Sequence, residues 1–175
     1  MLRTLFRTGP SRTRIDALYA RAVAQARTPG FYTAMGVADR IDARFELYTL
    51  HVLLLIMRLR EMGDEGGDLG QALFDTYVSA LDHALRELGV SDVAVGKKMR
   101  KLGEALYGRM QAYEAALKAD DAGALAAAIA RNILESQDFE AGRALARYVL
   151  DSRTRLAAQD MRALEMEPDW AEVHA

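Results

Sequence analysis

The stretch that decides the fold is LYTLHVLLLIMRLR, residues 47–60, the most apolar run in the chain. A helix that spans a membrane needs about 20 consecutive apolar residues. The apolar run begins at Leu47 and ends before Arg58 and Arg60, so it has about half of that length. We therefore expect a helix inside a folded core, not a membrane span.

The surrounding segment, residues 40–62, is apolar on nearly every side of the predicted helix. One face carries Phe45, Tyr48, Val52, Leu55, Leu59 and Met62, and the remainder carries Leu50, Leu53, Leu54, Ile56 and Met57. A helix that is apolar all round is usually buried. This segment is the predicted central helix of the protein.

The rest of the chain also has helical periodicity, without strand-like alternation or a repeat of fixed period. Further helices are predicted at residues 12–27, 69–88, 93–119, 122–134 and 138–167. Glycines in GDEGGD, residues 63–68, are expected to end the central helix, and TPGFYTAMGVAD, residues 28–39, is expected to be an ordered loop. The predicted class is all-α, a compact single-domain bundle of five to six helices.

Length and composition limit the classes of function. The chain has 175 residues, a net charge of −2 and no cysteine. It is long enough for one domain with a real core, it cannot form disulfides or thiolate metal sites, and it lacks the bulk positive charge of a DNA-binding protein. We expect a basic N-terminal arm at residues 1–14, a helical domain at 15–167 and an acidic tail at 168–175. The arm is either a solvated terminus, the simpler interpretation, or a presequence or lipid contact.

Motifs of the common catalytic classes are absent. The sequence contains no His-Glu-x-x-His, no P-loop and no Gly-x-Ser-x-Gly. Its three histidines are His51, His83 and His174, and neither of the first two follows a glutamate by three residues, as di-iron bundles require. We predict no enzyme, no cofactor and no metal.

His51 lies in the middle of the predicted central helix, between Leu50 and Val52. We expect a neutral core histidine that is hydrogen-bonded to a neighbouring helix, because one histidine cannot complete a metal site. The alternative is a haem-binding protein or small enzyme that uses His51.

Charged side chains gather near the predicted turn at residues 89–92. Asp75, Asp82 and Glu87 are expected to form a solvated face or ion pairs with Arg86 and the following basic cluster. That cluster contains Lys97, Lys98, Arg100 and Lys101. It is either a solvated face, a contact for anionic lipid headgroups, or a contact for an acidic partner or RNA.

Several segments together resemble the ubiquinol–cytochrome c chaperone family, and its bacterial branch in particular. They are YARAVAQARTPGFYTAMGV (19–37), RFELYTLHVLLLIMRLR (44–60), LFDTYVSALDHALRELGVSDVAVGKKMRKL (73–102), YGRMQAYEAAL (107–117) and LAAAIARNI (125–133). These segments follow one another along the chain in the same order as in members of the family. The chain departs from the usual pattern at Ala38, Ala43, Ser91 and Gly96, which concerns the client more than the fold.

The resemblance implies a non-enzymatic assembly factor for the respiratory quinol:cytochrome c reductase. Mitochondrial members of the family bind newly made cytochrome b and work near the ribosomal exit site. The expected partners are cytochrome b or another membrane-protein client, together with the ribosome exit site or an anionic membrane surface. The Arg- and Ala-rich composition is typical of a bacterial genome of high GC content, so we expect the cytoplasm or the cytoplasmic face of the inner membrane. A helical adaptor with an unrelated partner is a further alternative.

A chaperone for a membrane protein needs an apolar groove and a charged rim. The residues that we expect to contact the partner are Phe31, Tyr32, Met35, Arg44, His51, Arg58, Arg60, Arg86, Lys97, Lys98, Lys101 and Arg109. Methionine and aromatic side chains suit adaptable apolar contacts, and the cations would form the rim.

Overall fold

The computed structural model describes residues 11–173, and this part of the chain is all-α. The elements are α1 (Arg12–Ala26), α2 (Gly30–Thr33), α3 (Ile41–Arg60), α4 (Gly63–Glu87), α5 (Asp92–Lys118), α6 (Ala122–Asn132), the 3-10 turn η1 (Phe139–Gly142), α7 (Arg143–Ala157) and α8 (Met161–Met166). The predicted all-α class is confirmed. The helices outnumber the predicted five to six, because two short α-helices, α2 and α8, accompany the six longer ones in this range.

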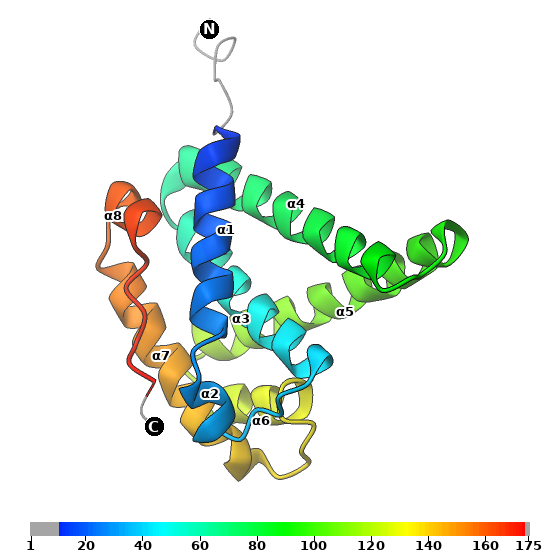
Figure 1. The fold of residues 1–175 in the computed structure, drawn as a ribbon. Coiled ribbons are helices and arrows are strands. Elements are labelled where there is room, and N and C mark those ends of the chain that lie inside the picture. The colour runs from blue at the N-terminus through cyan, green and yellow to red at the C-terminus, as the bar shows by residue number, and fades with distance from the viewer. Residues whose placement is uncertain (1–10, 174–175) are drawn as a thin grey trace, which may run out of the picture.

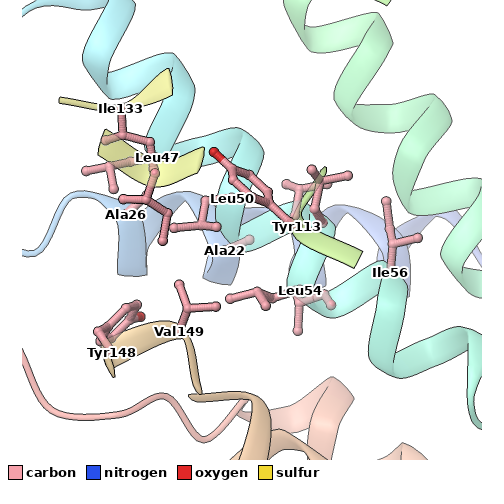
Figure 2. Close-up of a cluster of buried hydrophobic side chains, with 14 of the residues drawn as sticks. Ala22, Ala26, Leu47, Leu50, Leu54, Ile56, Tyr113, Ile133, Tyr148 and Val149 are labelled. Carbon is pink, nitrogen blue, oxygen red and sulfur yellow. The ribbon is translucent and has the colours of Figure 1, made fainter. Parts of the chain in front are cut away.

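Helix α3 is the centre of the fold, as its apolar sequence predicts. Eleven of its 20 residues are buried. It packs against α1, α4, α5 and α7, so neighbours cover it on several sides (Figure 1). Figure 2 shows side chains of α1, α3, α5 and α7 meeting in this core; among those labelled are Ala22, Ala26, Leu47, Leu50, Leu54, Tyr113 and Val149. No helix within residues 11–173 is both long and apolar enough to cross a bilayer.

The central helix ends before the glycine-rich segment 63–68, as expected, but the next helix, predicted to begin at residue 69, already begins at Gly63. The turn is made at Gly63, whose φ is +77°, and α4 begins there. Gly66 instead serves helix packing, because an added Cβ would overlap the carbonyl oxygen of Leu59 on α3. Glycine in this segment therefore permits both a tight turn and a close approach of two helices.

The long final helix predicted at residues 138–167 is also wrong, since it is divided into η1, α7 and α8. Asp138 caps η1 by accepting a hydrogen bond from the Glu140 amide at 3.0 Å. Asp160 caps α8 by accepting one from the Ala163 amide at 2.8 Å. Side-chain capping of this kind starts a new helix and turns the chain.

Residues 168–173, which we call the C-terminal segment, run back along α7 (Figure 1). The amide of Ala171 donates to the Ser152 hydroxyl at 3.1 Å, and both residues are buried. Arg155 on α7 also holds Asp169 at 2.8 Å. The apolar residues of the acidic C-terminal segment, Trp170, Ala171 and Val173, thus pack against the core of the domain.

Helices α4 and α5 form a long hairpin that extends away from the rest of the molecule (Figure 1). The base of the hairpin joins α3, and its far end is the turn at residues 88–91. At 25 residues, α4 is about 38 Å long. The turn is therefore the part of the described chain that lies far from the core around α1, α3 and α7.

Candidate functional site

His51 lies wholly inside the core, with both ring nitrogens hydrogen-bonded. Nδ1 lies 2.7 Å from the carbonyl oxygen of Leu47, and Nε2 lies 2.8 Å from the hydroxyl of Tyr148 on α7. A carbonyl oxygen only accepts, so Nδ1 carries the proton and Nε2 accepts from Tyr148. Burial lowers the pKa of His51 to about 4, so the ring is neutral. No ring nitrogen is free to bind haem or a metal in this arrangement.

An aromatic cluster surrounds His51. The ring of Phe31 lies 5.4 Å from His51 and 4.9 Å from Tyr148, and the ring of Trp170 lies 5.0 Å from His51. Gln25 on α1 donates to the Tyr148 hydroxyl at 3.1 Å. The cluster joins α1, α2, α3, α7 and the C-terminal segment, and it closes the core at the side where Trp170 lies.

A groove of 740 Å³ runs along the outer side of this cluster. We call it the α7 groove. Its lining residues are Ala34, Met35, Ala144, Arg147, Tyr148, Asp151, Thr154, Arg155, Ala171 and Glu172. The lining is mixed: the alanines and Met35 are apolar, and two arginines and two acids are charged. Such a surface accepts an apolar segment with polar flanks.

The aromatic loop predicted to contact a partner is partly helical, and its three predicted contact residues lie in different environments. Its centre is the short helix α2, because the Pro29 and Gly30 carbonyls accept helical hydrogen bonds. Phe31 is fully buried, and like His51 it offers no surface to a partner in this conformation. Tyr32 is half-buried and donates to the Ala26 carbonyl at 2.9 Å. Met35 reaches the α7 groove.

Three of the predicted arginines have internal roles. Arg58 donates to the carbonyls of Leu156 at 3.0 Å and Gln159 at 2.7 Å, and so ties α3 to the end of α7. Arg109 on α5 pairs with Glu46 on α3. Arg86 pairs with Asp82 at 2.6 Å, as expected, and also with Asp92, whereas Asp75 accepts from Gln71 and Glu87 lies beside His83.

Two other arginines, Arg44 and Arg60, are exposed, as Arg86 is. Arg44 pairs with Asp39 at 2.5 Å and lies 5.9 Å from the centre of the Tyr32 ring. Arg60 lies against the sulfur of Met110 at 3.9 Å. Neither side chain reaches the α7 groove, so the structure does not gather the predicted arginines into one rim.

The Glu46–Arg109 pair is partly buried between α3 and α5. Burial raises the pKa of Glu46 to about 7, although Arg109 opposes the shift. Glu46 Oε2 and Arg109 Nε have no hydrogen-bond partner among residues 11–173. Two incompletely paired ionic groups thus lie where the hairpin joins the central helix.

Lys97, Lys98 and Lys101 lie at the other end of α5 and are exposed, together with Arg100. This basic cluster is separated from the α7 groove by the length of the hairpin (Figure 1). The predicted partner-binding residues therefore fall into distinct places. Within residues 11–173 no three His, Asp or Glu side chains converge in a way that could hold a metal.

The residues of α7 that line the groove were missed by the sequence interpretation. Ala144, Arg147, Asp151 and Thr154 recur at three- and four-residue intervals, which places them on one helix face. The same pattern describes any solvated helix face. Only the position of Met35 and Ala171 opposite these residues makes the face one side of a groove.

Comparison with known proteins identifies relatives of this fold. Residues 33–168 match the ubiquinol-cytochrome C chaperone family. A Xenopus laevis protein, ubiquinol-cytochrome-c reductase complex assembly factor 1, is 23% identical over 120 residues. That alignment covers 69% of this chain and 60% of the relative, so the chain spans about three fifths of the curated relative.

A solved structure has the same fold over nearly the whole chain. The crystal structure of the Cbp3 homolog from Brucella abortus superimposes with a TM-score of 0.83 and 36% sequence identity. The superposition covers 92% of this chain and 90% of the Brucella chain. With the sequence match over most of the domain, it follows that the chain belongs to the ubiquinol–cytochrome c chaperone family.

Proposed function

We propose that this protein is a non-enzymatic assembly chaperone of the quinol:cytochrome c reductase and that cytochrome b is its client. The observation that carries the proposal is the family match over residues 33–168. The Xenopus relative is named as an assembly factor of that complex, which supports the same process.

The α7 groove is the surface that we assign to the client. Cytochrome b is a membrane protein, so its unassembled segments present apolar side chains. Ala144 and Ala171 are small and permit close approach of a client segment, and Met35 supplies an adaptable apolar contact. The flanking Arg147 and Glu172 can bind polar groups at the ends of such a segment.

Deletion of the gene in its host tests the process. We expect a fall in the reduced-minus-oxidised signal of b-type cytochrome and in the quinol:cytochrome c reductase activity of membranes. Wild-type protein supplied in trans should restore both. Normal values of both in the deletion strain would refute the proposed process.

A pair of variants tests the groove. Ala144→Arg places a long cation in the groove lining, whereas Ala24→Arg makes the same change at a position on α1 that is also exposed and lies outside the groove. We expect the first variant to be present at normal abundance yet to fail to restore cytochrome b, and the second to restore it. Equal rescue by both would leave the chaperone role intact and remove the groove from it.

A further inference from the structure

The far end of the α4–α5 hairpin carries a concentration of unpaired positive charge. Lys97, Lys98, Arg100 and Lys101 are all exposed, and none forms an ion pair with any residue between 11 and 173. The fourth lysine of the chain, Lys118, pairs with Glu114 at 2.7 Å. Unlike Lys118, the four cations of the cluster therefore have no ion-pair partner within the described part of the chain.

Acidic groups close to the cluster are already engaged. Asp82 and Asp92 both bind Arg86, and Glu87 lies 3.3 Å from His83. Of the acids on α5 near the cluster, Glu104 follows Lys101 by three residues without pairing to it. The outward face of α5 at residues 97–104 thus keeps a surplus of positive charge.

The cations share one side of the helix. Lys97, Arg100 and Lys101 are related by three- and four-residue steps and lie opposite the stripe that contains Val95 and Leu106, both buried. Lys98 flanks this side. The helix thus presents several cations outward together, within a length of about 6 Å.

An exposed apolar side chain lies at the same end. Leu88 ends α4 at the turn and is 59% exposed. Residues 88–101 contain no aromatic side chain, and the exposed Tyr107, two turns further along α5, is a single ring that is held by Gln111 and not interleaved with the cations. Single-stranded RNA is bound by cations interleaved with aromatic rings, whereas a membrane surface attracts cations and accepts an apolar side chain.

We propose that the α4–α5 hairpin end, formed by Leu88, Lys97, Lys98, Arg100 and Lys101, docks on the anionic headgroups of a phospholipid membrane. The charge complementarity and the projecting position carry this assignment (Figure 1). Docking there leaves the α7 groove free, because the groove lies on the body of the molecule. It would hold the chaperone beside the bilayer into which a membrane-protein client inserts, and in this sense it deepens the proposed function.

Vesicle co-sedimentation of the full chain tests the proposal without any client. The probes are vesicles of phosphatidylcholine alone and vesicles with about one third phosphatidylglycerol. We expect binding to the anionic vesicles only, lost at high salt because screening weakens surface electrostatics. Each cation near such a surface contributes about a fivefold change in partition. Reversal of Lys97, Lys98 and Lys101 to glutamate should therefore lower binding by at least about 100-fold.

The control reverses three exposed cations elsewhere, Lys118, Arg131 and Arg162, and so changes the net charge equally. It should retain vesicle binding. Leu88→Ser should lower binding several-fold without changing its salt dependence. If the triple reversal impairs folding, as circular dichroism would show, Lys101→Gln alone should still lower binding about fivefold.

Three results would overturn the proposal: no binding to anionic vesicles, equal loss in the two triple variants, or preference for a uridine 20-mer over vesicles through the same lysines. The last result would assign the surface to RNA. Because the assay contains no cytochrome b, a failed client proposal does not affect its outcome.

Discussion

The hydroxyl of Tyr148 on α7 donates to Nε2 of His51 on α3 across 2.8 Å, inside a fully buried part of the core. With Nδ1–H bound to the Leu47 carbonyl, the ring satisfies both nitrogens only when it is neutral. Burial accordingly lowers the pKa of His51 to about 4 and raises that of Tyr148 to about 12. The two residues form a polar link that joins two helices in an apolar environment.

Acid should weaken the fold through His51. The unfolded chain binds a proton on this histidine below about pH 6.5, whereas the native state does so only near pH 4. The unfolding free energy should therefore fall as the pH drops from 6.5 to 4, by up to about 3 kcal/mol from this group. Urea unfolding of wild type and His51→Gln across this range measures the difference. A pH-independent difference would contradict the assigned neutral state.

Removal of the Tyr148 hydroxyl should destabilise the protein without opening a large cavity. Tyr148→Phe leaves Nε2 of His51 buried without a donor, and such a group costs about 1–3 kcal/mol. The matched control is Tyr107→Phe, because Tyr107 is 59% exposed and its hydroxyl binds only Gln111 on the same helix. Chemical denaturation should show a change within about 0.5 kcal/mol for the control. Equal effects of the two variants would mean that the hydrogen bond between Tyr148 and His51 makes no measurable contribution to the free energy of unfolding.

Periodicity was sufficient to predict the central helix and the neighbouring long helices. The run around Leu50 and Leu55 is buried because its helix is apolar on all sides. That apolar pattern can be read directly from the sequence. The expectation of a core histidine bonded to another helix was confirmed at His51. Its partner could not be predicted, since Tyr148 lies 97 residues away.

The errors arose where one residue type serves two purposes. Glycines at 63–68 indicate a turn, but Gly66 lies within α4 and lets it approach α3. The α7 groove could not be predicted from the sequence for a related reason. It forms only where Met35, one face of α7 and Ala171 meet, and none of the three segments is distinctive alone.

Substitution of Gly66 tests the close approach of α3 and α4. The Cβ in Gly66→Ala would overlap the Leu59 carbonyl, which is backbone and cannot move aside without shifting a helix. We expect destabilisation of about 2–3 kcal/mol from overpacking. Gly67→Ala is the control, because an added Cβ there meets no atom within 4 Å. It should be neutral or stabilise α4 by up to about 1 kcal/mol. Thermal or urea unfolding that ranks the two variants in the opposite order would refute this account of the helix contact.

The partly buried Glu46 should oppose the effect of His51 on pH dependence. Its pKa is raised to about 7 in the native state, chiefly by burial, and is ordinary in the unfolded chain. The native state therefore binds the extra proton between about pH 7 and 4.5, so Glu46 favours the fold at the acid end of this range and weakens it as the pH rises through 7. Glu46→Gln should remove that loss, and the variant should gain stability relative to wild type between pH 5 and 8.

Glu135→Gln provides a control of opposite sign for Glu46→Gln. Its hydrogen bond and ion pair with Arg40 lower the pKa of Glu135, so its contribution is present above the ordinary glutamate pKa and is lost only in more acidic solution. Between pH 5 and 8 this control should shift the unfolding midpoint by a constant amount. A constant shift for Glu46→Gln as well would mean that Glu46 stays ionised throughout. The attraction of Arg109 would then outweigh the burial of the carboxylate at the base of the α4–α5 hairpin.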